Sequence, residues 1–489
     1  MSLKVEQAGT GPGWRTWIAG RPVASLGALV LSAGLCASGQ CAPGAAEFSE
    51  TVVWAKNIGG ARLATLAGEL FEADSCDDEA LCHRVEDVRR TQDPVLHATY
   101  RSGDQCYAIS LPDGSYDLVY YFVEPDGQPH KQRVMDISIE DRRVLSNLRI
   151  AEAAAGEPRN AAIRGFRDIR LTDGQLDTCV ESRVGQAVVS GLLVRNSRFS
   201  DTGWDLVWED DFSDVDAFAD NWTAEQWAPG HVNNEVQAYT RDRKNVRIED
   251  GVLILEAHRT GLADPAYSSG RVHSWGNRAI HYGRLDIRAR VPEGRGVWPA
   301  IWLMPVDPYR YATHCSEEQG KGEDDASCDS WPNSGEIDLM EHIGHEPDLI
   351  HGTVHTRDFY AGLGTQIQST IVVPDLDETF HTYSLVWKQG AMAMYIDGVR
   401  YFAYFDEGQG EGQWPFDHAF HIVMNLAVGG KWSDSHGPVE EDAFPRRLEI
   451  DYVRIYEPEP AQQSTAQAEY APPFLETTDP PQEALRRSP

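Results

Sequence analysis

The sequence predicts an all-β protein with two domains, an N-terminal β-sandwich followed by a C-terminal β-jelly-roll sandwich. Short segments that alternate apolar and polar residues recur along the chain, and turn-forming residues separate them. Convincing helical periodicity is absent from 204–457. The 489 residues are enough for two or three domains, each with its own core.

Residues 47–195 form the first predicted domain. Pro112-Asp113-Gly114 and Thr172-Asp173-Gly174 predict hairpin-type turns. Regular short strands joined by such turns are typical of a sandwich. The strand-like segments are 51–55, 106–111, 116–122, 133–139 and 187–194.

A polar linker, 196–203, precedes the second predicted domain at 204–457. About 250 residues with this pattern suit one two-sheet jelly roll with a groove across its concave face. Residues 458–489 are rich in Pro, Gln, Ala, Thr and Glu, which predicts a disordered tail. Representative strand-like segments of the second domain are 252–257, 282–290, 382–387 and 393–397.

The charge balance limits the partners that the protein can have. Lys and Arg number 43 against 76 Asp and Glu, a formal net charge of −33. Such a surface repels nucleic acid and anionic membranes, so a neutral polymer is the favoured substrate class. We expect a monomer.

Residues 1–46 are predicted to be an export signal. Lys4, Arg15 and Arg21 precede an apolar run, 23–35, that is too short to span a bilayer comfortably. The long basic region also leaves an uncleaved N-terminal anchor open. We expect an exported protein, whether secreted, periplasmic or at the cell surface.

Six of the eight cysteines lie beyond this segment. An even number in an exported protein predicts disulfides. Closeness in sequence favours Cys76–Cys82 and Cys315–Cys328, which leaves Cys106–Cys179.

The segment from Ser334 to His342 concentrates acidic residues. Glu336 and Asp338 share one face of a strand, whereas regular alternation would turn Glu341 away. A β-bulge near Leu339-Met340 would bring Glu341 back to the same face. A retaining glycosidase needs one ionised carboxylate and one protonated carboxyl about 5–5.5 Å apart, and this row can supply both. The alternative is an exposed acidic strand.

The first domain resembles the malectin-like carbohydrate-binding domain. The loop at 125–130, where the family carries sugar-binding aromatic residues, has none here, so either a sugar-binding module or a packing domain is expected. The resemblance rests on Trp54-Ala55-Lys56-Asn57-Ile58-Gly59-Gly60, Phe71-Glu72-Ala73-Asp74, Leu111-Pro112-Asp113-Gly114-Ser115-Tyr116 and Gln132-Arg133-Val134-Met135-Asp136-Ile137.

The second domain resembles glycoside hydrolase family 16, and within it the laminarinase-like endo-β-1,3-glucanases of concanavalin A-like fold. The motifs occur in order over the whole domain. They are Asn233-Asn234-Glu235, Ser269-Gly270-Arg271, Tyr282-Gly283-Arg284, Trp298-Pro299-Ala300-Ile301-Trp302-Leu303-Met304, Ser334-Gly335-Glu336-Ile337-Asp338-Leu339-Met340-Glu341, His351-Gly352-Thr353-Val354-His355, Tyr395-Ile396-Asp397-Gly398, Asn425-Leu426-Ala427-Val428-Gly429-Gly430-Lys431-Trp432 and Asp451-Tyr452-Val453-Arg454-Ile455-Tyr456.

The resemblance implies roles for individual residues. Glu336 would be the nucleophile, Glu341 the acid/base and Asp338 their helper. The extra residue before Glu341 gives the bulged form of laminarinases, agarases and carrageenases. The substrate-binding residues would be Asn233, Arg271, Trp298, Trp302, His355 and Trp432.

No cofactor is expected for the reaction. Asp451 matches a position that binds a structural Ca²⁺ in many relatives, so Ca²⁺ is a possible structural ion; the alternative is an ordinary strand aspartate. An acidic insertion, 308–329, precedes the acidic strand and would either border the cleft or decorate the surface.

We therefore expect retaining, endo-acting hydrolysis of β-1,3-glucan. The alternatives are hydrolysis of another β-linked glucan or galactan (mixed-linkage glucan, agar or carrageenan), transglycosylation, or glucan recognition without catalysis. Proteins that only bind would have lost the two glutamates, whereas this chain keeps both.

Overall fold

A computed structural model describes residues 52–74, 76, 80–125, 133–150, 158–196, 203–261, 266–313, 330–346 and 348–459. The predicted export signal, the Cys315–Cys328 pair, and most of the linker, of the acidic insertion and of the tail lie outside these residues. Within them, no helix combines the length and apolar character needed to span a membrane.

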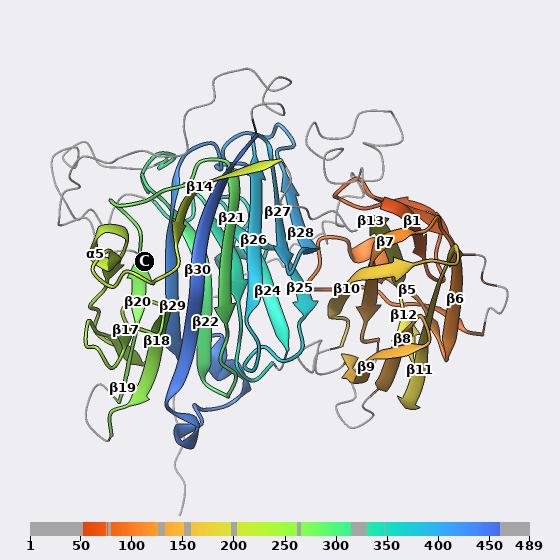
Figure 1. The fold of residues 1–489 in the computed structure, drawn as a ribbon, viewed down its shortest axis with the longest axis horizontal. Helices are drawn as coiled ribbons and strands as arrows, with labels where there is room; N and C mark the ends of the chain where they lie inside the picture. The colour runs from red at the N-terminus through yellow and green to blue at the C-terminus, as the bar shows by residue number, and fades with distance from the viewer. Residues whose placement is uncertain are drawn as a thin grey trace, which may run out of the picture.

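The first domain is a β-sandwich extended by a small third sheet, as the sequence predicts (Figure 1). A four-residue helix, α3 (Pro94–His97), precedes β5. The six-stranded sheet contains, in order, β10 (Ala161–Leu171), β7 (Gly114–Val123), β13 (Gly191–Asn196), β1 (Val52–Asn57), β3 (Leu70–Ala73) and β2 (Leu63–Ala64). The four-stranded sheet contains β6 (Gln105–Ser110), β11 (Gln175–Val184), β8 (Val134–Ile139) and β9 (Arg142–Arg149), and the small sheet contains β12 (Val188–Val189), β5 (Thr99–Ser102) and β4 (Cys82–Arg84).

The two predicted hairpins of this domain are wrong. β6 and β7 flank the turn at 112–114 but lie in different sheets, and so do β10 and β11 around 172–174. β11 pairs with β6 and β10 pairs with β7, so a two-stranded ribbon bends from one sheet into the other. The backbone hydrogen bond from Leu111 N to Gly174 O joins its strands at the bend. Turn residues mark a change of chain direction, and this direction change is a sandwich corner.

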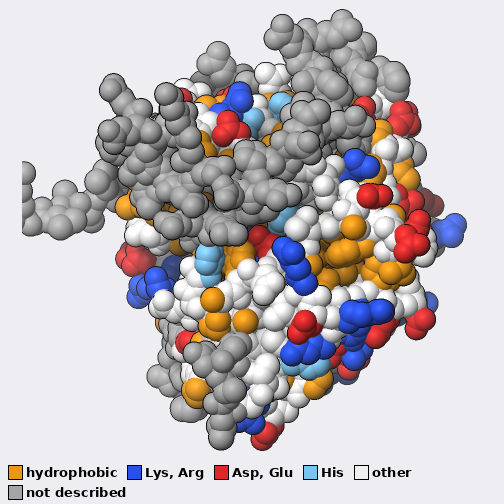
Figure 2. Space-filling view, turned by 90° about the vertical axis from the view of Figure 1, so that its left-hand side faces the viewer, with side chains coloured by type: hydrophobic (Ala, Val, Ile, Leu, Met, Phe, Trp, Pro, Cys, Tyr) orange, Lys and Arg blue, Asp and Glu red, His pale blue; other side chains and the backbone are white. Residues whose placement is uncertain are grey.

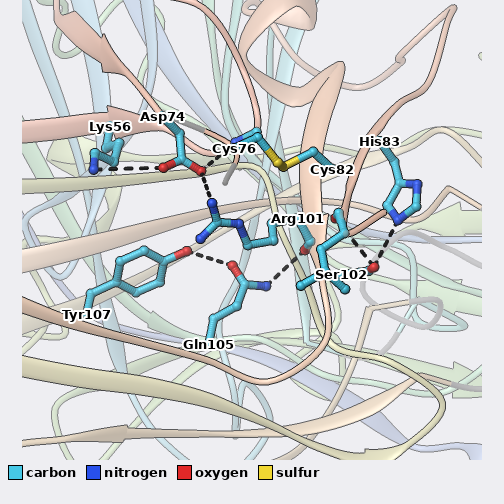
Figure 3. Close-up of a disulfide and its surroundings, with 11 residues drawn as sticks. Lys56, Asp74, Cys76, Cys82, His83, Arg101, Ser102, Gln105 and Tyr107 are labelled. Carbon is cyan, nitrogen blue, oxygen red and sulfur yellow. Dashed lines mark hydrogen bonds and ion pairs between the residues drawn. A yellow bond between two sulfur atoms is a disulfide. The ribbon is translucent and has the colours of Figure 1, made fainter. Parts of the chain in front are cut away.

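Two disulfides are present in the first domain, Cys76–Cys82 and Cys106–Cys179. Both are predicted pairs. Cys106–Cys179 joins directly paired residues of β6 and β11. Figure 3 shows Asp74 close to Cys76–Cys82, between Lys56 and Arg101. Its carboxylate lies 3.8 Å from Lys56 Nζ and 2.9 Å from Arg101 Nη2, so the charges around this disulfide hold three strands together.

The second domain consists of two facing sheets, a jelly roll as predicted (Figure 1). Its short helices are α5 (Phe218–Asn221), η1 (Ala361–Leu363), η2 (Ser433–His436) and η3 (Glu441–Ala443). The ten-stranded sheet contains β16 (Gln237–Tyr239), β19 (Tyr267–Ser269), β18 (Val252–Arg259), β30 (Arg446–Pro458), β21 (Gly283–Arg290), β26 (His381–Lys388), β27 (Ala391–Ile396) and β28 (Val399–Phe405), with β14 (Trp204–Asp210) on β30 and β17 (Val246–Glu249) on β18. The seven-stranded sheet contains β15 (Thr223–Ala224), β20 (Arg271–His273), β29 (Phe420–Val428), β22 (Val297–Pro305), β23 (Glu336–Glu341), β24 (Leu349–His355) and β25 (Ile367–Val372).

The two domains share packed surfaces. Leu118, Tyr120 and Phe122 of β7 lie in the core of the sandwich, whereas Val119 and Tyr121 join an apolar cluster continuous with the second domain. A strand buried on both faces explains why 118–123 is an unbroken apolar run.

The edge strands of the second domain meet β10 of the first. Thr370 Oγ1 on β25 donates to Ala161 O over 3.0 Å, and Arg164 Nη1 on β10 donates to Val372 O over 3.1 Å. A Cβ atom at Gly165 would lie 2.3 Å from Val399 of β28, so glycine permits this approach. Open strand edges invite unwanted pairing, and the first domain covers these two (Figure 1).

The negative charge is not gathered into one patch on the face that Figure 2 shows. On the face of the second domain in Figure 2, Lys and Arg side chains are interspersed with Asp and Glu, and hydrophobic side chains lie between them.

Candidate active site

The β-bulge predicted in the acidic strand is present in β23. Trp302 on β22 pairs with Asp338, and the preceding residue, Ile301, pairs with Met340, so Leu339 is the extra residue. The register against β24 shifts between Asp338 and Glu341 as well. Leu339 and Met340 are both fully buried in the core. The bulge thus restores Glu341 to the face of Glu336 and Asp338, and all three carboxylates line one pocket.

The opposite sheet supports the bulge. Tyr401 on β28 crosses the core, and its hydroxyl donates to Leu339 O over 2.6 Å. A Cβ atom at Gly352 on β24 would lie 2.6 Å from the Tyr401 ring, so glycine leaves the space that this ring fills. The hydroxyl satisfies a carbonyl that the interrupted ladder leaves free.

Replacing Tyr401 by Phe is expected to destabilise the protein by about 1–3 kcal/mol, because the buried Leu339 carbonyl loses its donor. Thermal unfolding measures this loss. Tyr383→Phe is the matched control, since Tyr383 is buried in the same core and its hydroxyl has no partner among the described residues. Equal melting temperatures for the two variants would contradict the role given to the Tyr401 hydroxyl.

The pocket above the bulge has a volume of about 640 Å³ and opens on the seven-stranded sheet. Every predicted substrate-binding side chain lines it together with the three carboxylates. These side chains are Asn233, Arg271, Trp298, Trp302, His355 and Trp432. These six come from three strands, β20, β22 and β24, and two loops, so the fold assembles the site from segments distant in sequence.

Three neighbours of Glu336 favour its ionised form. The Trp331 indole donates to its Oε2 over 2.9 Å. Burial raises the pKa of Glu336 to about 7, while the Trp331 hydrogen bond, the charge of Arg271 and a hydrogen bond from Asp338 act to lower it.

The charge of Glu336 favours the protonated forms of Glu341 and Asp338. Burial raises the pKa of Glu341 to about 7 against the hydrogen bond from the Trp298 indole, 3.0 Å from its Oε1, and the Glu336 charge raises it further. Burial and the charges of Glu336 and Glu341 raise the pKa of Asp338 well above its usual value. The row can therefore hold an anion at Glu336 beside protonated Asp338 and Glu341.

His355 completes the acidic row as a neutral imidazole. Burial lowers its pKa to about 4. The Ala361 N–H donates to His355 Nδ1 over 3.3 Å, so the ring proton lies on Nε2. Nε2 is 3.4 Å from Asp338 Oδ2 and 3.9 Å from Glu336 Oε1, which places its N–H dipole beside both carboxyl groups.

Aromatic faces form the walls of the pocket. The rings of Trp298 and Trp432 meet edge to face, with centroids 5.5 Å apart. Across the pocket the Arg271 guanidinium lies 4.2 Å from the Trp227 ring centroid and 4.9 Å from that of Trp302. Aromatic faces of this kind can pack on the apolar faces of pyranose rings.

Several pocket residues were not found by sequence reasoning. Trp331 immediately precedes the acidic strand, and an aromatic residue five positions before Glu336 was the available signal. Asn425 accepts a 2.8 Å hydrogen bond from the Trp302 indole, and Glu225, which does not itself line the pocket, pairs with Arg271. Arg90, from the first domain, had no local signal at all.

The predicted structural ion was assigned to Asp451. There, Arg288 Nη1 lies 2.5 Å from Asp451 Oδ2. Calcium takes six to eight oxygen ligands, and the other carboxylate oxygen, Oδ1, is not part of this ion pair. The structural calcium ion stays a prediction.

Comparison with known proteins identifies the family. The model for the malectin domain matches 52–195, and that for glycosyl hydrolases family 16 matches 233–454. A β-glucanase of Rhodothermus marinus is 39% identical over 280 residues, covering 55% of this chain and 92% of that protein. A glucan endo-1,3-β-glucosidase of Cryptopygus antarcticus is 33% identical over 281 residues, covering 54% of this chain and 96% of that protein.

A solved laminarinase structure from Rhodothermus marinus has a TM-score of 0.46 and 38% identity, covering 52% of this chain and 97% of that one. The match to the β-glucanase spans nearly all of that protein. The chain therefore belongs to glycosyl hydrolases family 16, as a laminarinase-like member that carries a malectin domain.

Proposed function

We propose that this protein hydrolyses β-1,3-glucan within the polymer chain and retains the anomeric configuration. The observation that carries the proposal is the bulged acidic row, which sets Glu336, Asp338 and Glu341 on one face of the pocket with unequal environments. The relatives named as a β-glucanase and a glucan endo-1,3-β-glucosidase support the choice of substrate.

The first step forms a glycosyl-enzyme. The Glu336 carboxylate attacks the anomeric carbon while protonated Glu341 donates its proton to the departing glycosidic oxygen. Trp331 and Asp338 hold the attacking carboxylate through hydrogen bonds. The Glu336 charge is consumed in this step, so the Coulombic effect that raises the pKa of Glu341 is removed.

The second step releases the product. Glu341, now ionised, removes a proton from water, and the water oxygen attacks the anomeric carbon and displaces Glu336. Two inversions at the same carbon give net retention. The Trp298 indole, 3.0 Å from Glu341 Oε1, stabilises the ionised acid/base at this stage.

The remaining pocket side chains are proposed to bind the sugar chain, and the protein is proposed to be exported. Trp298, Trp302 and Trp432 would pack on sugar rings, while Asn233, Arg271 and His355 would contact hydroxyl groups. The two disulfides support export, because such bonds persist in oxidising compartments. The monomeric state remains a prediction.

A reducing-sugar assay on laminarin, lichenan, agarose and carrageenan tests the substrate. Release of oligosaccharides from laminarin is expected, because this pocket belongs to a chain whose relatives act on glucan. NMR of the first product tests retention, which predicts the β-anomer before mutarotation. Activity on agarose or carrageenan with none on laminarin would establish the galactan alternative, and binding without hydrolysis would establish a recognition protein.

A further inference from the structure

Arg90, a residue of the malectin domain, lines the pocket of the hydrolase domain. Its two terminal nitrogens lie 3.1 and 3.0 Å from the two carboxylate oxygens of Glu346. The Arg90 side chain is 15% exposed and that of Glu346 is fully buried. A buried, two-pronged arginine–carboxylate pair has a fixed geometry, so this contact locates both partners.

Glu346 in turn contacts β24, the strand beside the acidic row. Its Oε2 lies 2.6 Å from His351 Nε2, and His351 pairs directly with Glu341 across β23 and β24. Each Glu346 oxygen thus contacts Arg90, and one of them also contacts His351. Loss of Arg90 would leave a buried carboxylate with only two histidine contacts among the described residues, His351 at 2.6 Å and His345 at 4.0 Å, and the more closely bonded His351 ring would shift to compensate.

Two tryptophan rings connect the His351 side chain to the Glu341 carboxylate. The His351 ring meets the edge or face of Trp432 at 4.8 Å between centroids and an interplanar angle of 79°. Trp432 meets Trp298 in the same manner at 5.5 Å, and the Trp298 indole donates to Glu341. Packed side chains transmit small displacements because protein interiors have little free space.

The backbone around Arg90 is held firmly on both sides. Its neighbour Arg89 is bonded through both backbone groups, to Arg159 O and Ala161 N, at 2.8 and 3.0 Å. Two residues after Arg90, the Gln92 side-chain amide hydrogen-bonds both backbone groups of Ala403 on β28. Arg90 itself has a left-handed backbone with φ of +59°. The malectin domain therefore presents this arginine from a fixed position against the hydrolase.

We propose that Arg90 is a positioning residue of the hydrolase site, and that the malectin domain completes this site by setting the Glu346–His351–Trp432–Trp298 series that orients Glu341. The proposal rests on the acid/base role proposed for Glu341. It gives the malectin domain a role that does not require it to bind sugar.

The test compares Arg90→Ala and Arg90→Lys with the wild type in the full-length protein. Arg90→Ala is expected to lower kcat about ten- to a hundredfold, the usual loss when a residue that orients a reacting group is removed. KM is expected to change by less than about threefold, because the loss arises in the transition state. Arg90→Lys is expected to recover part of kcat, since lysine keeps the charge but not the two-pronged geometry.

Arg167→Ala is the matched control. Arg167 also crosses the domain junction, where its Nη1 donates to Asp397 O over 2.5 Å, and it lines a different hollow. Its kcat is expected to stay within about twofold of the wild type. Melting temperatures of all variants separate a loss of folding from a loss of positioning. Wild-type kcat in Arg90→Ala, or equal losses in Arg90→Ala and Arg167→Ala, would overturn the proposal.

A second readout does not depend on activity. The Trp298 indole N–H resonance, assigned with Trp298→Phe, reports the hydrogen bond to Glu341. It is expected to shift in Arg90→Ala and to stay in place in Arg167→Ala; an unmoved resonance in Arg90→Ala would overturn the proposal. If the wild type hydrolysed none of the polymers, the proposed function would fail while this resonance still decided the positioning role.

Discussion

Glu336→Gln is expected to lower kcat on laminarin by at least about 10⁴-fold while the protein stays folded. The amide has nearly the size of the carboxylate but cannot form the glycosyl-enzyme. Trp331 donates to Glu336 Oε2, and an amide turned to present its oxygen there can still accept this hydrogen bond. Binding of the polymer should therefore survive, and the loss should appear in kcat.

The measurement combines steady-state kinetics with a chemical rescue. Glu336→Ala supplied with azide is expected to yield a glycosyl azide of inverted configuration, because the small anion attacks in place of the missing carboxylate. Glu411→Gln, on an exposed residue outside the pocket, serves as the control and should retain wild-type kcat. Unchanged turnover in Glu336→Gln would show that Glu336 is not the nucleophile.

Glu341→Gln is expected to lower kcat by about 10²–10⁴-fold on the polymer, the usual contribution of a general acid–base. The loss should be small for the first step with an aryl glucoside whose leaving group needs no proton. In the wild type, kcat/KM should fall as the pH rises through about 7, because burial raises the pKa of Glu341 to that value and the acid must be protonated to act.

Three other groups influence the same titration. Glu336 raises the pKa of Glu341 by its charge, Trp298 lowers it by donating a hydrogen bond, and Asp338 shares the buried row. The alkaline limb is therefore a property of the coupled row. In Glu341→Gln this limb should disappear, and pH profiles of the two proteins measure the change. An identical alkaline limb in the variant would assign it to another group.

The bulge shows how far a local pattern reaches. Alternation with period two is a property of each strand by itself, so the misplaced Glu341 could be recognised from six residues and the bulge inferred. The carbonyl of the bulge residue Leu339 accepts a hydrogen bond from the Tyr401 hydroxyl, and Tyr401 is 62 residues further along the chain and in the opposite sheet. Nothing in the spacing around either residue indicates that contact.

The two predicted hairpin turns show that turn residues do not decide which strands pair. Pro112-Asp113-Gly114 correctly marks a change of chain direction, because its residue types favour a turn wherever they occur. Whether the next strand pairs with the previous one or starts the other sheet depends on which surfaces need burial. β7 is buried on both faces, so it lies in the sheet between the sandwich core and the hydrolase domain.

The sequence by itself determined the two β domains, the order of the family motifs, the three acids and the bulge that aligns them, because strand period, turn chemistry and motif spacing are local. Only the tertiary structure decided which side chains give those acids different environments. Trp331 contacts Glu336, Trp298 contacts Glu341, and Arg90 contacts Glu346 across a separation of 256 residues. Such contacts depend on how complete sheets pack, and packing is a property of the whole chain.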